Sequence, residues 1–151
     1  MFQISERILL TFWIGGMWTV GYIVAPTLFA QLEDRTLAGA VAGQLFSIMS
    51  YIGLLAGGIL ISGQFYYAKA HWHRNWRLWL LFAMLLIIVV GEFYLQPMMA
   101  DLKLAGLIQG SENAKQFGQL HGIASTLFVI NSLLGLVLVV FGLRSSDTSL
   151  Q

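Results

Sequence analysis

Two polar side chains lie where the chain is otherwise apolar, and their types could support binding chemistry. Glu92 is the only formally charged residue inside the stretches that are long and apolar enough to cross a membrane, and His121 is the only histidine inside one. A carboxyl group at membrane depth is costly and usually faces a polar partner or a water-filled cavity. One apolar stretch ends shortly after Glu92 and the next begins shortly before His121, on the same side of the membrane. The sequence therefore predicts that Glu92 and His121 approach each other.

Three further polar residues could complete a site around this pair. Gln96 follows Glu92 by one helical turn and shares its helix face, while Gln44 and Tyr22 are the polar neighbours expected from two other helices. Together these groups could bind a small solute or a cation. The simpler interpretation is that Glu92 and His121 form a polar pair that holds two helices together, as such pairs in membranes commonly do.

A metal ion is an alternative ligand for the same region. The candidate metal ligands are His121, Glu92, Met98 and Met99. One imidazole and one carboxylate are too few for a closed tetrahedral zinc site, whereas thioether and imidazole would suit Cu(I). The chain has no cysteine, which excludes disulfides, thiolate metal sites and cysteine nucleophiles.

Haem is a third alternative, because bundles of four helices can hold b-type haem between axial ligands on facing helices. Only His121 could act within a span, since His71 and His73 belong to a connection at the opposite surface. This disfavours a bis-histidine haem within one subunit and leaves a His–Met haem, or a haem between subunits, open. The sequence requires no cofactor, and the small-molecule ligand stays unknown.

The sequence lacks the motifs of the common enzyme classes. It contains no HExxH, GxSxG or Walker loop, and no GxGxxG after a strand. The net charge is +1 and no basic face is evident, so nucleic acid is not an expected partner. These absences favour a protein that is not an enzyme.

The elements that must position these residues are membrane-spanning helices. Apolar residues make up 58% of the chain and charged residues only 10%, whereas soluble domains carry about 25% charged residues. A spanning helix needs about 20 mostly apolar residues. Four stretches satisfy this, over approximately residues 8–32, 40–68, 78–97 and 117–143. We expect one all-α domain over residues 1–151, an integral membrane bundle of four transmembrane helices in the lipid bilayer, with a flexible tail at 144–151.

The positive charges indicate the orientation of these helices. Four spans place both termini, and the connection between the second and third helices, on one side of the membrane. The basic residues on that side are Arg7, Lys69, Arg74, Arg77 and Arg144. Those on the other side are Arg35, Lys103 and Lys115. The positive-inside rule therefore places both termini in the cytoplasm.

Small residues recur in several predicted helices at a spacing that favours close packing. Glycines lie four residues apart in three pairs: Gly39 and Gly43, Gly53 and Gly57, and Gly118 and Gly122. In membranes, helices associate through such small-residue faces. We expect these glycines to mediate helix packing and the protein to form a homo-oligomer.

Two prolines interrupt the predicted helices toward the same end of the bundle. Pro26 leaves the carbonyl of Tyr22 without its helical donor, and Pro97 does the same to Phe93. Such carbonyls need a partner at membrane depth, either a neighbouring helix or enclosed water. The prolines therefore predict helix kinks that let the bundle close, or else a polar cavity that opens toward the outside.

Several motifs resemble those of one membrane-protein family. The first is Trp13-Ile-Gly-Gly-Met-Trp-Thr-Val-Gly-Tyr-Ile-Val-Ala-Pro-Thr-Leu-Phe. The others are Ala42-Gly-Gln-Leu-Phe, Gln96-Pro-Met-Met, and Phe117-Gly-Gln-Leu-His-Gly-Ile-Ala-Ser together with Asn131. They resemble a bacterial family of unknown function, domain of unknown function 4149, which is related to the eukaryotic transmembrane-protein-205 group. The resemblance implies a four-helix protein of the bacterial inner membrane and no catalytic activity.

The first of these motifs is also similar, more loosely, to the opening helix of two other groups. These are copper-resistance membrane proteins and haem-binding protoporphyrinogen oxidases with four helices. The oxidases place a histidine early in the first helix, whereas residues 5–14 of this chain contain none. That difference argues against a haem-dependent oxidase.

These observations favour a membrane protein that binds or passes a small solute or cation through an outward-facing polar pocket. A second hypothesis is a structural or accessory subunit that assembles through its small-residue helix faces. A third is a membrane redox protein that binds haem or copper.

Overall fold

The computed structural model describes residues 2–67, 76–108 and 110–141, with side chains from residue 5 to 64 in the first of these ranges. The described chain folds into four long helices and contains no strand, which confirms the all-α prediction. Their segments, in chain order, are α1 (Phe2–Trp18), η1 (Thr19–Val24), α2 (Ala25–Gln31), α3 (Arg35–Tyr67), α4 (Trp76–Val90), η3 (Gly91–Leu95), α5 (Gln96–Leu104) and α6 (Glu112–Phe141). The α1–η1–α2 and α4–η3–α5 segments are each one continuous helix.

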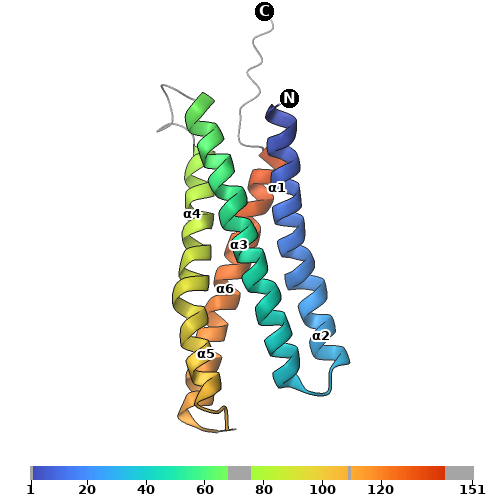
Figure 1. The fold of residues 1–151 in the computed structure, drawn as a ribbon, viewed down its shortest axis with the longest axis vertical. Helices are drawn as coiled ribbons and strands as arrows, with labels where there is room; N and C mark the ends of the chain where they lie inside the picture. Colours follow the sequence, from blue (N-terminus) through green and yellow to red (C-terminus); the bar gives the residue numbers. More distant parts are fainter. Residues whose placement is uncertain (1, 68–75, 109, 142–151) are drawn as a thin grey trace, which may run out of the picture.

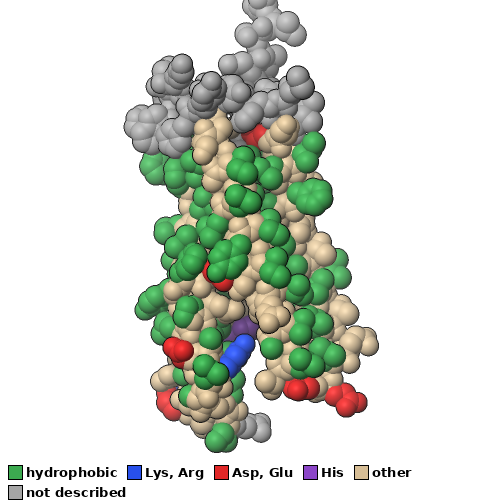
Figure 2. Space-filling view, in the orientation of Figure 1, with side chains coloured by type: hydrophobic (Ala, Val, Ile, Leu, Met, Phe, Trp, Pro, Cys, Tyr) green, Lys and Arg blue, Asp and Glu red, His purple; other side chains and the backbone are tan. Residues whose placement is uncertain are grey.

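All four helices are long and apolar enough to cross a membrane. The qualifying segments are Ser5–Gln31, Arg35–Gln64, Trp76–Leu104 and Glu112–Phe141. Large apolar side chains such as Phe12, Leu55 and Leu86 are 81%, 68% and 65% exposed. Figure 2 shows hydrophobic side chains distributed over the described part of one face. Exposed apolar surface of this extent is typical of contact with lipid. The chain is therefore a multi-pass membrane protein.

The helices extend beyond the predicted spans at the ends that carry polar residues. The second begins at Arg35, because the Asp34 carboxylate accepts hydrogen bonds from the backbone N–H groups of Thr36 (2.8 Å) and Leu37 (3.2 Å) and so caps α3. The third continues past Pro97 to Leu104. The predicted tail at 144–151, and the residues His71 and His73, lie outside the described residues.

The helices alternate in direction, so the bundle has two distinct ends (Figure 1). At the terminal end, α1 begins and α6 ends side by side. At the opposite end, which we call the turn end, lie the α2–α3 turn and the connection between α5 and α6. This arrangement matches the even number of spans expected from the sequence.

The apolar core fills the half of the bundle near the terminal end. Its buried members are Leu10, Trp13, Ile14, Met17, Ala56, Leu60, Leu81, Met84, Ile88 and Leu138. Three glycines make room for this packing. A Cβ atom at Gly53 would lie 2.6 Å from the Trp13 Nε1, one at Gly57 would lie 2.4 Å from a Leu85 methyl group, and one at Gly135 would lie 2.8 Å from Ile14. The bundle therefore packs closely at these three glycines.

A π-helical turn precedes each of the two prolines. In η1 the Ala25 N–H donates to the carbonyl of Val20, and in η3 the Gln96 N–H donates to the carbonyl of Gly91, in both cases five residues back. Proline offers no N–H to the preceding turn, so the backbone there loses a helical bond in any case. A wider turn accommodates this loss and lets the helix continue instead of ending.

Toward the turn end the bundle separates into two pairs of segments. α2 packs against α3, and α5 packs against α6. Contacts between the two pairs include that of Tyr22 in η1 with Ser132 of α6 and that of Phe93 in η3 with Tyr51 of α3. In Figure 1 the lower part of α3 and the segment α5 diverge. This separation leaves an open space between α3 and α5.

Candidate functional site

A cleft of about 390 Å³ lies between α3 and α5 at the turn end. Seven residues line it: Ala40, Gly43, Gln44, Ser47 and Ile48 from α3, and Gln96 and Lys103 from α5. Figure 2 shows the hollow, with blue and purple side chains inside it, on a face that is otherwise mainly apolar. Polar side chains thus gather at one open cleft of a membrane-spanning bundle.

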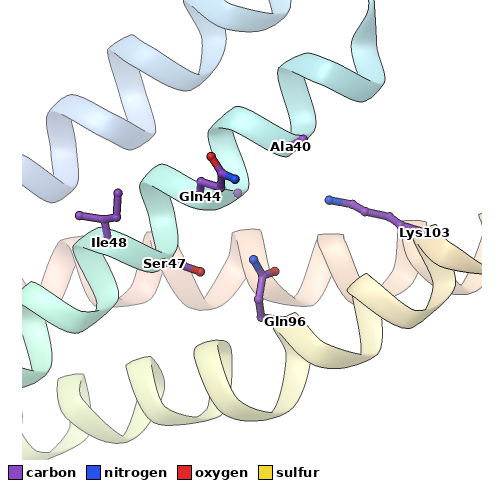
Figure 3. A pocket seen from close by; sticks show the side chains of 7 residues that line it. Ala40, Gln44, Ser47, Ile48, Gln96 and Lys103 are labelled. Atoms are coloured by element: carbon purple, nitrogen blue, oxygen red, sulfur yellow. The ribbon is translucent and has the colours of Figure 1, made fainter.

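Helical spacing places the α3 residues on one wall. Positions 40, 43, 44, 47 and 48 follow the i, i+3, i+4, i+7 pattern that puts side chains on one face. Gly43 leaves room for the opposite wall, because a Cβ atom there would lie 3.6 Å from the Gln96 Nε2. In Figure 3, Gln96 points toward Ser47 and Gln44. The α3 wall and the α5 wall therefore approach each other at Gly43 and Gln96.

The opposite wall owes its direction to the π-turn η3. Gln96 is the first residue after this turn, and Lys103 follows seven residues later on the same helix face. A π-turn holds one residue more than an α-turn, and each residue rotates an α-helix by about 100°. Because the π-turn η3 takes up the extra residue locally, α5 is not rotated by about 100° and keeps the face with Gln96 and Lys103 toward α3.

Lys103 is the only charged residue that lines the cleft. Its side chain extends from α5 toward α3, in the direction of Gln44 and Ala40 (Figure 3). The Lys103 Nζ lies 5.5 Å from the centre of the Phe117 ring, and Phe117 stacks on His121 with ring centres 6.0 Å apart. No ion pair in the described part of the chain involves Lys103. The cleft therefore carries one unneutralised positive charge, held beside a stacked aromatic pair.

Of the five predicted pocket residues, Gln44 and Gln96 line the cleft. Glu92 is half-buried in η3, about one turn before Gln96, and does not line it. His121 is exposed and stacks on Phe117 outside the lining. Within the described residues no hydrogen bond or ion pair joins Glu92 to His121. Their approach to within a short distance stays a prediction.

Tyr22 serves a different contact from the one predicted. Its hydroxyl donates to the Ser132 Oγ over 3.0 Å, and its ring meets Phe128 edge-on, with centres 5.4 Å apart. Phe128 in turn packs against Gly21 and meets Phe46 at 5.5 Å. Tyr22 therefore ties the first helix to α6 and does not line the cleft.

Among the described residues, His121 and Glu92 belong to no cluster of imidazole and acidic side chains that could hold a metal ion. No group of three or more His, Cys, Asp or Glu side chains lies close enough there to hold a metal ion. Met99 is buried while its neighbour Met98 is exposed, so the two thioethers face different surroundings. A soft-metal site that uses these methionines with His121 stays a prediction, as does haem.

The six predicted packing glycines fall into three groups. Gly53 and Gly57 lie at close helix contacts in the core, whereas Gly39 and Gly43 lie in ordinary contact with the side chains of Phe29 and Gln96. At Gly118 and Gly122 an added Cβ atom would meet nothing within 4 Å. These last two glycines therefore mediate no close helix contact within this chain, because their face of α6 is open.

Two polar residues at the terminal end escaped the sequence analysis as a pair. Glu6 and Gln64 are only 6% and 3% exposed, and the Gln64 Nε2 donates to the Glu6 Oε2 over 3.2 Å. Glu6 lies just before the first uncharged stretch, so hydropathy alone does not indicate that it is buried. The available signal was its spacing: it lies four and seven residues before Leu10 and Trp13, on the helix face that packs into the core.

Asn131 is a further buried polar residue, and it lies between the first helix and α6. It is 4% exposed, and its Nδ2 lies 3.7 Å from the Met17 Sδ. Its Oδ1 is buried without a hydrogen-bond partner. Asn131 therefore lies in the interface between the first helix and α6, close to the Tyr22–Ser132 contact.

Comparison with known proteins places the chain in a family. A family model described as Domain of unknown function (DUF4149) matches residues 8–107, which is about two thirds of the chain. The chain belongs to the DUF4149 family. No curated protein and no solved structure matches it. The relation of DUF4149 proteins to the transmembrane-protein-205 group stays a prediction.

The DUF4149 match contains both walls of the cleft. It spans the first three long helices and ends before α6, and all seven lining residues lie between positions 40 and 103. By contrast, the partners of Lys103 outside the lining, Phe117 and His121, belong to α6 and lie beyond the match. The cleft is thus a feature of the DUF4149 part of the chain.

Proposed function

We propose that this DUF4149 protein binds a small polar solute in the cleft between α3 and α5, on the outer side of a bacterial inner membrane. The observation that carries the proposal is the cleft itself, whose walls bring together Gln44, Ser47, Gln96 and Lys103. Its volume of about 390 Å³ falls within the range of about 300–1,000 Å³ that is typical of small-molecule sites.

The polar walls support binding because such groups are costly at membrane depth unless they have partners. Amide, hydroxyl and ammonium groups facing hydrocarbon would each lose hydrogen bonds with water. An open cleft at the turn end gives them access to water or to a polar solute. The rest of the exposed bundle surface is mainly apolar, which makes this concentration of polar groups specific to the cleft.

The described conformation supports binding rather than free passage. The buried core cluster fills the terminal half of the bundle, which is the half beyond the cleft. A solute that enters at the turn end would therefore meet closely packed side chains. Passage through the membrane would require the core to open.

The excess of basic residues at the terminal end supports its placement in the cytoplasm, which turns the cleft outward. Because the chain has no native cysteine, single introduced cysteines report on both the cleft and its side of the membrane. We expect Ser47→Cys to react with a membrane-impermeant maleimide in intact cells.

Three variants serve as controls for this experiment. Glu33→Cys, in the exposed α2–α3 turn, should react from the same side and confirm the orientation. Leu55→Cys, on the apolar outer surface of α3, and Ala56→Cys, in the core, should stay unreacted, because a thiol forms its reactive thiolate poorly away from water. Labelling of Glu33→Cys without labelling of Ser47→Cys would contradict a water-filled cleft. Labelling of Glu33→Cys and Ser47→Cys only after the cells are permeabilised would show that the cleft faces the cytoplasm.

A further inference from the structure

We infer that the solute bound in this cleft carries an anionic phosphate group on an organic body, and that Lys103 is the residue that binds it. The inference rests on the proposed function and names the chemistry of its ligand. It depends on the charge of the cleft, on the donors around Lys103, and on the size of the space.

The charge of the lining favours an anion over a cation. Lys103 contributes the only formal charge among the seven lining residues, and no carboxylate is among them. A cation in the cleft would meet a like charge and no acidic ligand. Glu92, the acidic residue for which a cation site was predicted, lies about one turn further into the bundle and outside the lining.

The ammonium group of Lys103 has capacity for such a ligand. Its contact with Phe117 occupies one side, with the Nζ 5.5 Å from the ring centre, and no ion pair among the described residues neutralises it. An ammonium group has three donors, and the aromatic face uses none of them as a directed hydrogen bond. Phe117, which itself stacks on His121, therefore acts as a positioning residue that holds the charge at the cleft.

Two glutamine amides and a hydroxyl group supply further donors. In Figure 3, Gln96 and Lys103 extend from α5 toward the wall that carries Gln44 and Ser47. Each amide NH₂ offers two donors and the serine hydroxyl one. A lysine charge surrounded by neutral donors is a recurring arrangement for binding phosphate oxygens, in which lysine acts as a point charge.

The size and position of the cleft indicate an organic anion rather than a bare inorganic ion. A volume of about 390 Å³ is several times that of a phosphate group, and Ala40, Gly43 and Ile48 form an apolar part of the wall. An organic body would fill that part. The same phosphate chemistry could come from a soluble metabolite that enters from water or from a lipid headgroup that enters from the bilayer.

Protection of an introduced cysteine tests the inference on the full chain. The Ser47→Cys protein in nanodiscs of phosphatidylcholine is labelled with a small uncharged maleimide, with and without glycerol 3-phosphate, and separately in nanodiscs that contain phosphatidylglycerol. We expect one of these two phosphate sources to slow labelling at least tenfold. Protection by glycerol 3-phosphate would identify a soluble ligand, and protection by phosphatidylglycerol alone a lipid headgroup.

Matched charge variants separate specific binding from general electrostatics. Lys103→Gln should abolish the protection, which is the ratio of the labelling rates of this variant without and with the phosphate source. Lys115 is an exposed lysine at the same end of the bundle that does not line the cleft, so Lys115→Gln should leave the protection intact. Labelling of Ser47→Cys that neither phosphate source slows, or protection that survives Lys103→Gln, would overturn the inference and leave the water-filled cleft standing. Absence of any labelling would instead remove the proposed function itself.

Discussion

At the scale of single residues, Glu92 shows how a charged side chain can lie within a membrane helix without a described partner. It is half-buried, and no hydrogen bond or ion pair in the described part of the chain involves it. We expect Glu92→Gln to leave the melting temperature in detergent unchanged or to raise it by up to about 3 °C, because glutamine keeps the shape and removes the cost of burying a charge. A fall of more than about 5 °C would point instead to a partner that requires the carboxyl group, such as His121.

The Gln64–Glu6 contact leads to the opposite expectation. Replacing Gln64 by Leu removes a donor to a buried carboxyl group, so the bundle should lose about 1–3 kcal/mol of unfolding free energy. Titration with a denaturing detergent, followed by circular dichroism, would measure the loss. Gln44→Leu is the matched control, because this amide is exposed and should change stability by less than about 0.5 kcal/mol. Equal effects of the two substitutions would contradict a structural role for the Gln64–Glu6 contact.

The sequence located some cleft residues and missed others for physical reasons. Gln44 and Gln96 stood out because amides are rare in apolar stretches. Lys103 did not, since a lysine beyond Pro97 is typical of a charge that ends a span, whereas the helix continues to Leu104 and Lys103 lines the cleft. Hydropathy measures how polar a residue is and not the direction of its side chain. That direction depends on how α5 packs against α6.

At the scale of the elements, the π-turn η3 holds one residue more than an α-turn. Deleting one residue from it tests whether the helix tolerates the loss of that extra residue. Removing Tyr94, which is 64% exposed, should convert η3 to an α-turn and keep the facing of α5, so the protein should still fold with a cleft accessible to label at Ser47→Cys. Removing Leu86 from α4, which is 65% exposed, should rotate all following residues by about 100° and prevent folding. Size-exclusion profiles of the two deletion proteins would distinguish these outcomes. Equal loss of folded protein would argue against the insertion.

Close packing of α3 gives a second prediction for the elements. Gly57→Leu should cost about 1–3 kcal/mol or more, because even a Cβ atom there would overlap the Leu85 side chain. The adjacent Gly58 has nothing within 4 Å, so Gly58→Leu should change stability by less than about 0.5 kcal/mol. The same detergent titration measures both variants. Similar losses in the two variants would contradict the role assigned to the contact with Leu85.

The four helices themselves could be predicted because long apolar stretches have few other structures in a membrane. Their ends could not. The helix start at Arg35 depends on the Asp34 cap, and the extension to Leu104 depends on the π-turn before Pro97. Both are local backbone arrangements that hydropathy does not report.

At the scale of the whole molecule, the open glycine face of α6 is available for association between chains. We expect a homo-oligomer in mild detergent that becomes monomeric when Gly118 and Gly122 are both replaced by Leu, since a second helix could approach closely only where side chains are absent. Native mass spectrometry would measure the change, with Gly58→Leu as a control on another open face. A wild-type protein that is already a single monomeric species would contradict the expectation.

The confinement of the core to one half of the bundle has a consequence for local unfolding. Buried side chains from all four helices hold the terminal half together. By contrast, α2 and α5 each follow a π-turn, contain a proline in their first turn and pack mainly against a single partner. Regions with fewer buried contacts open more often and exchange their amide hydrogens sooner. The amide hydrogens of the turn end should therefore exchange with deuterium well before those of the terminal end. The side of the bundle that carries the cleft would unfold locally while the other half stays folded.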